Sequence, residues 1–202
     1  MTVEITTRIE KVVDFNGKHS VLSSWEKGFL ESILEQAHRR GKLSPRQVEI
    51  FEKSEQKCTV DALNAAKMWA DTYRKHHREA AKICARYYRS TGYFRSLSDD
   101  ILKDPEFVPT QKQYKKMCEN KYAKKVLAMS SAAPLYPIGS TVMFRKPALN
   151  YMNRRFDGVP CLILEVLDEI KSAAKGGKQY KILPYGSALP LVAEERHIKK
   201  CA

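Results

Sequence analysis

The residues whose types could support catalysis or metal binding do not stand at the spacings that this chemistry needs. His76, His77 and Cys84 together would suggest a metal site. However, adjacent histidines in a helix point about 100° apart, and no fourth ligand is evident. The acidic pairs Asp99-Asp100 and Glu194-Glu195 are also adjacent, so their carboxylates diverge in a helix or a strand. We therefore expect neither a metal site nor paired catalytic carboxylates.

Other enzyme motifs are also missing from the sequence. The run Gly176-Gly177-Lys178 has phosphate-loop residue types, but a P-loop needs GxxxxGK[ST] before a helix, and here a strand pattern follows. No GxSxG, HExxH or protein-kinase motif is present. The five cysteines, at 58, 84, 118, 161 and 201, include no CxxC pair, which predicts free thiols. We predict a protein that is not an enzyme and uses no metal or cofactor.

Composition and charge indicate the class of partner. The chain has 202 residues, 43% of them hydrophobic, which is enough for a real core. Its 36 basic and 23 acidic residues give a net charge of +13, with a pI near 9.5. Such an excess favours nucleic acid first, and an acidic membrane or protein second. The sequence shows no signal-peptide h-region and no bilayer-length apolar stretch, so we expect a cytoplasmic protein (host cytoplasm if viral) without a membrane partner.

The sharpest electrostatic pattern lies on a long helix predicted from Thr59 to about Ser90 and closed by Gly92. Seven cations fall within an arc of roughly 120–140° when the residues are spaced 100° apart. They are Lys67, Arg74, Lys75, Arg78, Lys82, Arg86 and Arg89. The stripe is suited to a phosphate backbone, and the alternative is a solvated helix face.

Helix signals dominate the rest of the first 132 residues. A helix begins at Ser23-Ser24 and ends at Gly41, and Ser44-Pro45 starts the next one. A short helix is predicted at 98–103 and a single fifth helix from Thr110 to about 129, with Tyr122 among the residues facing inward. Residues 1–20 alternate weakly and reach Asn16-Gly17, which predicts a strand or hairpin arm. The positions 130–139, rich in Ser, Ala, Pro and Gly, are predicted to form a linker.

Beyond this linker the apolar period changes from 3.6 to 2. Strands are predicted at 141–145, 159–166, 179–183 and 189–193. The expected fold class is therefore α+β, with a mainly helical domain of about five helices at 1–132 and a β domain at 133–202.

The β domain resembles a small SH3-like barrel of the KOW or Tudor type. The resemblance rests on PIGSTVMFR, FDGVPCLILEV, KQYKILPYG and VAEERHIKK, in which Gly139 with Val142 and Tyr180 with Ile182 hold the family's strand positions. Pro160 and Cys161 replace the second glycine of a full KOW motif, so the resemblance implies barrel geometry only. The chain as a whole resembles compact accessory proteins of bacteriophages.

These patterns predict a non-enzymatic accessory protein that binds DNA or RNA mainly through phosphates, in replication, recombination or transcription. Beside the helix stripe, the candidate contacts are Lys112 and Lys116 in the fifth helix, and in the β domain Arg145, Lys146, Tyr151, Arg154, Arg155, Phe156 and Lys178. Tyr151 and Phe156 would stack on bases, or the aromatic residues would form a peptide pocket or core. The alternative is an adaptor or inhibitor that docks on a polymerase, another replication enzyme or a host enzyme.

Overall fold

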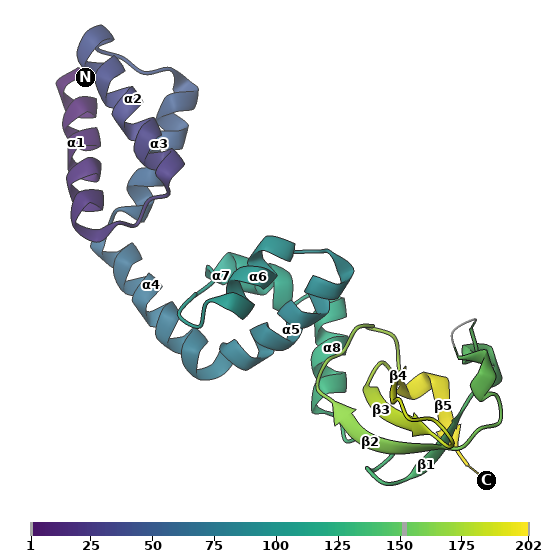
Figure 1. Ribbon diagram of the computed structural model, residues 1–202. Coiled ribbons are helices and arrows are strands. Elements are labelled where there is room, and N and C mark those ends of the chain that lie inside the picture. The colour runs from purple at the N-terminus through teal and green to yellow at the C-terminus, as the bar shows by residue number, and fades with distance from the viewer. Residues whose placement is uncertain (1, 151–152, 202) are drawn as a thin grey trace. The chain divides into compact units, whose positions relative to one another are not determined.

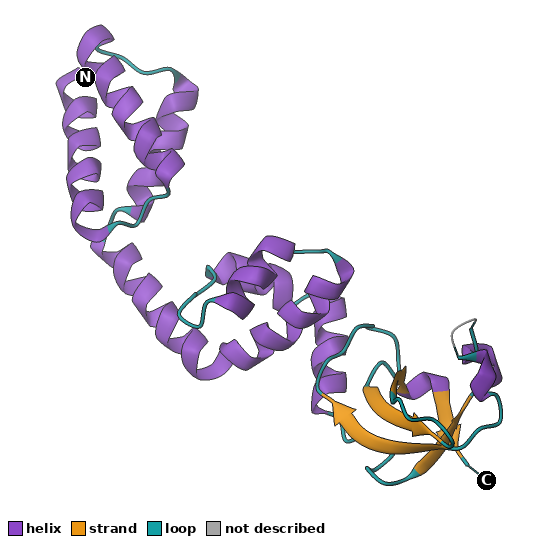
Figure 2. Ribbon diagram, in the orientation of Figure 1, coloured by secondary structure: helices purple, strands orange, loops and turns teal. Residues whose placement is uncertain are grey.

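In the computed structural model, residues 2–150 and 153–201 are described, and they form a mixed α+β protein (Figure 1). Helices fill the N-terminal part, and an antiparallel five-stranded sheet follows them (Figure 2). The chain divides into two compact units, unit 1 at Met1–Thr72 and unit 2 at Tyr73–Ala202. The α+β class is confirmed, although helices α1 to α8 exceed the five expected.

Unit 1 consists of α1 (Thr2–His19), α2 (Ser24–Arg40), α3 (Pro45–Lys57) and α4 (Val60–Thr72). The prediction of a strand and turn in residues 1–20 is wrong, because α1 runs from Thr2 to His19. Ile9 and Val12 lie three residues apart and are both buried in one core with Leu30 and Phe51. That 3.6-residue periodicity fits a helix packed on α2 and α3.

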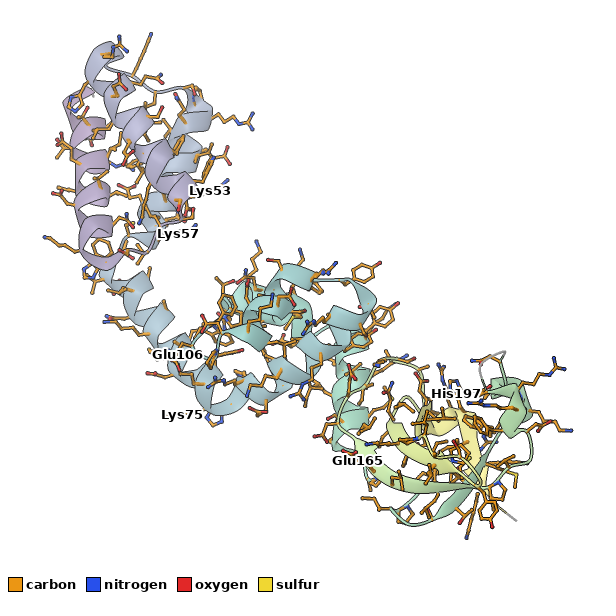
Figure 3. The ribbon with its side chains drawn as sticks, viewed as in Figure 1. Lys53, Lys57, Lys75, Glu106, Glu165 and His197 are labelled. Atoms are coloured by element: carbon orange, nitrogen blue, oxygen red, sulfur yellow. The ribbon has the colours of Figure 1, made fainter. Side chains whose placement is uncertain are left out.

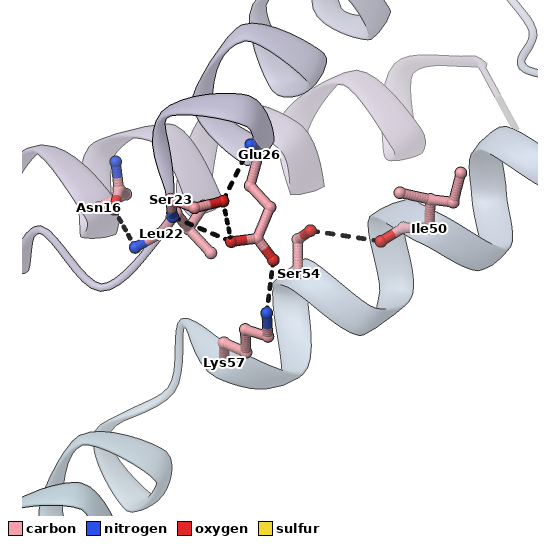
Figure 4. Close-up of polar contacts among 7 residues, drawn as sticks. All are labelled: Asn16, Leu22, Ser23, Glu26, Ile50, Ser54 and Lys57. Atoms are coloured by element: carbon pink, nitrogen blue, oxygen red, sulfur yellow. Dashed lines mark hydrogen bonds and ion pairs between the residues drawn. The ribbon is translucent and has the colours of Figure 1, made fainter. Parts of the chain in front are cut away.

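The predicted caps of α2 and α3 are confirmed. Ser23 accepts a hydrogen bond from the Glu26 N–H at 3.3 Å, and the Glu26 carboxylate accepts one from the Ser23 N–H at 2.9 Å (Figure 4). Gly41 ends α2 in the left-handed region at a φ of 71°. Ser44 caps α3 in the same way as Ser23 caps α2. Because such caps satisfy helix-end N–H groups through nearby side chains, they can be read from short sequence patterns.

The helix predicted from Thr59 to Ser90 is not continuous. A π-helical segment, η1 (Tyr73–His77), separates α4 from α5 (Arg78–Thr91). Tyr73 and His77 both contact the ring of Tyr114, with centroids 6.2 and 4.8 Å away. The wider π turn changes the angular spacing that the stripe prediction assumed.

The predicted fifth helix is also interrupted. After α6 (Arg95–Lys103), the chain forms α7 (Gln111–Cys118) and then α8 (Lys121–Ser131). Asn120 breaks the run because its side-chain oxygen accepts hydrogen bonds from the Tyr122 and Ala123 N–H groups and caps α8. Asn is among the best N-cap residues, so it starts a new helix here instead of continuing the old one.

The sheet contains β1 (Thr141–Phe144), β2 (Cys161–Leu167), β3 (Gln179–Pro184), β4 (Leu191–Glu194) and β5 (Ile198–Lys200). Its strand order is β4-β3-β2-β1-β5, with every neighbouring pair antiparallel. The strands confirm the predicted period-2 segments. Because β4 and β5 are the two edges, the sheet is not closed into a barrel by pairing between them.

The segment 130–139 takes part in the packing of unit 2. Tyr136 is 8% exposed and belongs to the hydrophobic core of the sheet. Its hydroxyl donates to the Ile198 carbonyl at 3.4 Å, and the Leu135 N–H donates to the Glu195 carboxylate at 3.1 Å. Helices α5–α8 and the sheet fall in the same unit, so a separate domain beginning at residue 133 stays a prediction. No helix of the described residues is both long and apolar enough to cross a membrane.

Candidate nucleic-acid interface

The excess positive charge belongs entirely to one unit of the chain. Unit 1 contains 11 basic and 11 acidic residues, so its net charge is zero. Unit 2 contains 25 basic and 12 acidic residues and therefore has the whole net charge of +13. A polyanion would be attracted to unit 2, where such a surplus creates a positive potential.

Within unit 2, helices α7 and α8 present a group of cations that we call the lysine surface. It consists of Lys112, Lys115, Lys116, Lys121, Lys124 and Lys125. All six are exposed, because α7 buries its other face through Tyr114 and Met117 and α8 buries Ala123 and Val126. Among the described residues none of the six is in an ion pair, so their charges stay available to a ligand.

The predicted stripe, by contrast, is largely engaged within the protein. Arg74 pairs with Glu106 at 3.6 Å, Lys82 with Glu79 at 2.8 Å and Arg89 with Asp99 at 3.6 Å. These carboxylates offset part of the positive potential, although exposed pairs of this kind exchange easily with other ions.

The remaining stripe residues divide into three cases. Arg78 donates a hydrogen bond to the Pro105 carbonyl. Lys67 lies in α4 and so belongs to unit 1. Lys75, on η1, and Arg86, on α5, are exposed and have no ion pair within the described part of the chain; Figure 3 labels Lys75 as well as Glu106.

Four of the cations predicted in the β domain are exposed in its loops. Lys146 and Arg154 line a cavity of about 420 Å³ together with Asp157. Arg145 is held in place by its Nε, which donates to the Ile198 carbonyl at 2.9 Å. Arg155 lies against the Phe156 ring, 4.7 Å from its centroid. These three arginines and one lysine all lie in the connection between β1 and β2, where their charges are open to solvent.

Two of the predicted contacts are corrected by burial. Phe156 is 7% exposed in the core of the sheet, so its ring is not open to a stacking base. Lys178 is 9% exposed, and its ammonium group donates to the Ala132 carbonyl at 2.5 Å. A lysine that serves as an internal donor is not free to bind phosphate. Tyr151 lies outside the described residues.

Sequence reasoning missed an aromatic cluster beside the lysine surface. Tyr88, Tyr93 and Tyr122 line a cavity of about 490 Å³, which we call the aromatic pocket. Tyr122 was predicted to face inward, yet it is 50% exposed, and Tyr93 is 71% exposed. The available signal was the concentration of aromatic residues around the helix-ending Gly92, namely Tyr87, Tyr88, Tyr93 and Phe94.

The pKa directions of the two buried tyrosines, Tyr87 and Tyr88, argue against acid-base chemistry there. Burial raises the pKa of Tyr88, and the hydrogen bond to Asn120 lowers it by less. Burial likewise raises the pKa of Tyr87. Both hydroxyls are therefore protonated near neutral pH and do not act as general bases.

Known proteins do not identify this interface. No protein-family model, curated protein or solved structure matches the chain. Within residues 2–150 and 153–201, no group of three or more His, Cys, Asp or Glu side chains could hold a metal ion. The geometry and charge of unit 2 are therefore what indicates a ligand.

Proposed function

We propose that this protein is a non-enzymatic nucleic-acid-binding accessory protein that contacts phosphates through unit 2. The observation that carries the proposal is the division of charge: unit 1 is neutral, whereas unit 2 has the net charge of +13. A solubility role alone would not require the charge to be confined to one unit. Phosphate contacts supply most of the affinity of non-specific nucleic-acid binding.

The lysine surface is the proposed main contact. Its six cations are exposed and unpaired within the described residues, and α7 and α8 hold them on consecutive helices. Lysine ammonium groups meet phosphates as point charges and do not read base edges by themselves. We therefore expect strong salt dependence and little sequence preference. Lys75 and Arg86, together with the loop arginines Arg154 and Arg155, are proposed as further phosphate contacts.

We also propose that the sheet is an SH3-like barrel of open form. The order β4-β3-β2-β1-β5 and the short 3-10 helix η4 (Glu195–His197) between β4 and β5 support this proposal. Strands β1 to β4 form a meander, and β5 returns to pair with β1, which brings the first and last strands side by side. Such small barrels serve many functions, so the barrel positions the loop cations without naming a ligand.

The test compares two variants that remove the same charge from different units. In the first, Lys112, Lys115, Lys124 and Lys125 of the lysine surface are replaced by Gln. In the control, the exposed unit 1 residues Lys11, Lys18, Lys27 and Lys42 are replaced by Gln. Gln forms helices nearly as well as Lys, so folding is little affected. Fluorescence anisotropy with labelled single strands and duplexes then measures affinity at several salt concentrations.

The expected results differ between the two variants. Each phosphate contact contributes about 0.7–0.9 to the slope of log K against log salt, so losing four flattens it by up to about 3–4 units. The control should keep the wild-type slope, because unit 1 makes no phosphate contact. Equal effects of the two variants would refute the lysine surface as the contact. Absence of any binding at low salt would refute the proposed function.

The second candidate function is a protein adaptor. The observation in its favour is a set of exposed apolar side chains on the sheet: Leu162 and Leu164 in β2 and Val192 in β4 are 43%, 38% and 56% exposed. Exposed apolar side chains that gather on one face commonly mark protein contacts. The adaptor function predicts that the protein binds no oligonucleotide at low salt but binds a purified polymerase or other replication enzyme. Replacing Leu162 and Val192 by Lys should then abolish binding of that enzyme.

A further inference from the structure

The aromatic pocket combines a buried floor with an exposed rim. The rings of Tyr87 and Tyr88 form the floor, at 8% and 5% exposure, with their centroids 4.9 Å apart. Phe94 meets Tyr88 edge-on at 5.0 Å. Tyr93 and Tyr122 stand at the rim, mostly open to solvent. At about 490 Å³, the pocket has the volume of a small-molecule site.

An unusual backbone displays the rim. Gly92 has a φ of 82° and Phe94 a φ of 50°, so Tyr93 lies between two residues in the left-handed region. Glycine adopts this region freely, but a bulky residue such as Phe adopts it at an energetic cost. The turn directs the Phe94 ring onto Tyr88 and leaves Tyr93 outside the core. Retained strain of this kind is common at binding sites.

Positive charge at the rim limits the kinds of ligand that can bind to the aromatic rings of the pocket. Lys116 lines the pocket, and the Lys121 ammonium lies 5.1 Å from the Tyr122 ring centroid. An aromatic cage for a methylated ammonium group would be disfavoured by these two cations. A ligand that joins a flat ring to an anion is favoured instead, and a nucleotide has both parts.

The Tyr88 hydroxyl and the Asn120 side chain, which both line the pocket, are already used within the protein. The Tyr88 hydroxyl donates to the Asn120 Oδ1 at 3.0 Å, and that oxygen also caps α8. The Asn120 Nδ2 donates to the carbonyls of Lys116 and Met117 at 3.0 and 2.9 Å. An Asn side chain has no further donor to offer a base edge after these bonds. The pocket therefore favours stacking over base reading.

We propose that the aromatic pocket binds an unpaired base of a single-stranded nucleic acid while the lysine surface holds the flanking phosphates. The proposal rests on the nucleic-acid-binding function proposed above and names the strand form that this surface takes. Bases inside a duplex are stacked and paired, so they cannot enter the pocket without leaving the helix. A basic groove with exposed aromatic rings is the usual means of binding single strands with little sequence preference.

The experiment separates base contacts from phosphate contacts. Anisotropy of the full chain is measured with a labelled single strand and with an abasic strand of equal length, which keeps the phosphates and lacks the bases. The test variant replaces Tyr93 and Tyr122 by Ala, and a rescue variant replaces both by Phe, which keeps the rings. Tyr185, which is 86% exposed on the β3–β4 turn, is replaced by Ala as the matched control. All three sites of substitution are exposed, so stability changes little.

The wild type should bind the base-bearing strand about five- to 150-fold more tightly than the abasic strand, the range that stacking of one base gives. The double Ala variant should lose this preference and keep its affinity for the abasic strand. The Phe variant and Tyr185→Ala should keep the preference. Three results would overturn the base-binding proposal and leave phosphate binding intact. The wild type could bind both strands equally, the Ala variant could keep the preference, or the Ala variant could bind both strands more weakly by the same factor. No binding of either strand at low salt would instead refute the proposed function as well.

Discussion

Replacing Asn120 by Ala tests how the helical part of unit 2 is held together. The Asn120 Oδ1 accepts hydrogen bonds from the N–H groups of Tyr122 at 3.0 Å and Ala123 at 3.1 Å. The same oxygen accepts from the Tyr88 hydroxyl of α5 at 3.0 Å. One side chain therefore caps α8 and also joins α8 to α5.

The expected loss of stability has two parts. Removing an Asn N-cap costs about 0.5–2 kcal/mol. The Tyr88 side chain is 5% exposed, so its hydroxyl would be left without this partner at about 1–3 kcal/mol. We expect Asn120→Ala to lower the free energy of unfolding of unit 2 by about 2–4 kcal/mol. Asn120→Ser loses the Nδ2 donations to the Lys116 and Met117 carbonyls just as Asn120→Ala does, but it keeps a side-chain oxygen that can cap α8, so it should cost less than Asn120→Ala.

The sequence itself supplies a separate probe for each unit. Both tryptophans, Trp25 and Trp69, lie in unit 1, and all ten tyrosines lie in unit 2. In a urea titration of the full chain, tryptophan fluorescence follows unit 1 and the near-UV tyrosine signal follows unit 2. Asn120→Ala should shift only the tyrosine midpoint, by about 1–3 M urea for ordinary m values.

Two results would refute this reasoning. If Asn120→Ser destabilises unit 2 as much as Asn120→Ala, the acceptor oxygen is not what matters. A double-mutant cycle with Tyr88→Phe should give a coupling of about 1 kcal/mol. Effects of Asn120→Ala and Tyr88→Phe that add within about 0.5 kcal/mol would mean that the hydrogen bond between them contributes nothing.

Two further predictions concern unit 1 and the thiols. Burial acts to raise the pKa of Glu26, but hydrogen bonds from Lys57 and Ser23 outweigh it and lower the pKa below the usual 4.5. The ionised Glu26 carboxylate therefore stabilises unit 1 at pH values above its unfolded-state pKa, and this stabilisation is lost as the pH falls through its folded-state pKa. Glu26→Gln should lower the free energy of unfolding of unit 1 by about 1–2 kcal/mol at neutral pH and make that free energy less dependent on pH in acid. Tryptophan fluorescence measures both effects. An unchanged dependence on pH would contradict the role given to Glu26. In thiol labelling of the native protein, Cys201 should react first, because the other four cysteines are buried. The pKa of Cys118 is also raised, by its hydrogen bond with Cys84 and by burial. Early labelling of Cys118 would contradict this packing.

Signals that depend on near neighbours in the chain predicted the structure well. Ser23, Gly41 and Ser44 bound the helices as expected, because a cap is satisfied by residues three or four positions away. The strands of the sheet were visible in the period of 2, since one face of each strand is buried. Asn120 was a readable signal of the same kind, although the surrounding apolar period concealed it.

Residues 1–20 show where local reading fails. Short apolar runs rich in Ile and Val fit a strand or a helix, and the choice depends on what they pack against. Ile9 and Val12 become a helix face because the core around Leu30 and Phe51 receives both. That core forms between segments distant in sequence, so its effect on α1 is not visible in the first twenty residues.

For the candidate site, the sequence by itself determined the mixed α+β class, the helix caps and the amount of positive charge, because these depend on composition and on close neighbours. Only the tertiary structure decided which cations are free: Arg74 is matched by Glu106 from another element, and Lys178 is turned onto the Ala132 carbonyl. It also decided which rings are open, since Phe156 is buried and Tyr93 is displayed. The physical reason is that burial and ion pairing depend on which residues the fold brings together in space, and the positions of those residues along the chain do not predict these contacts.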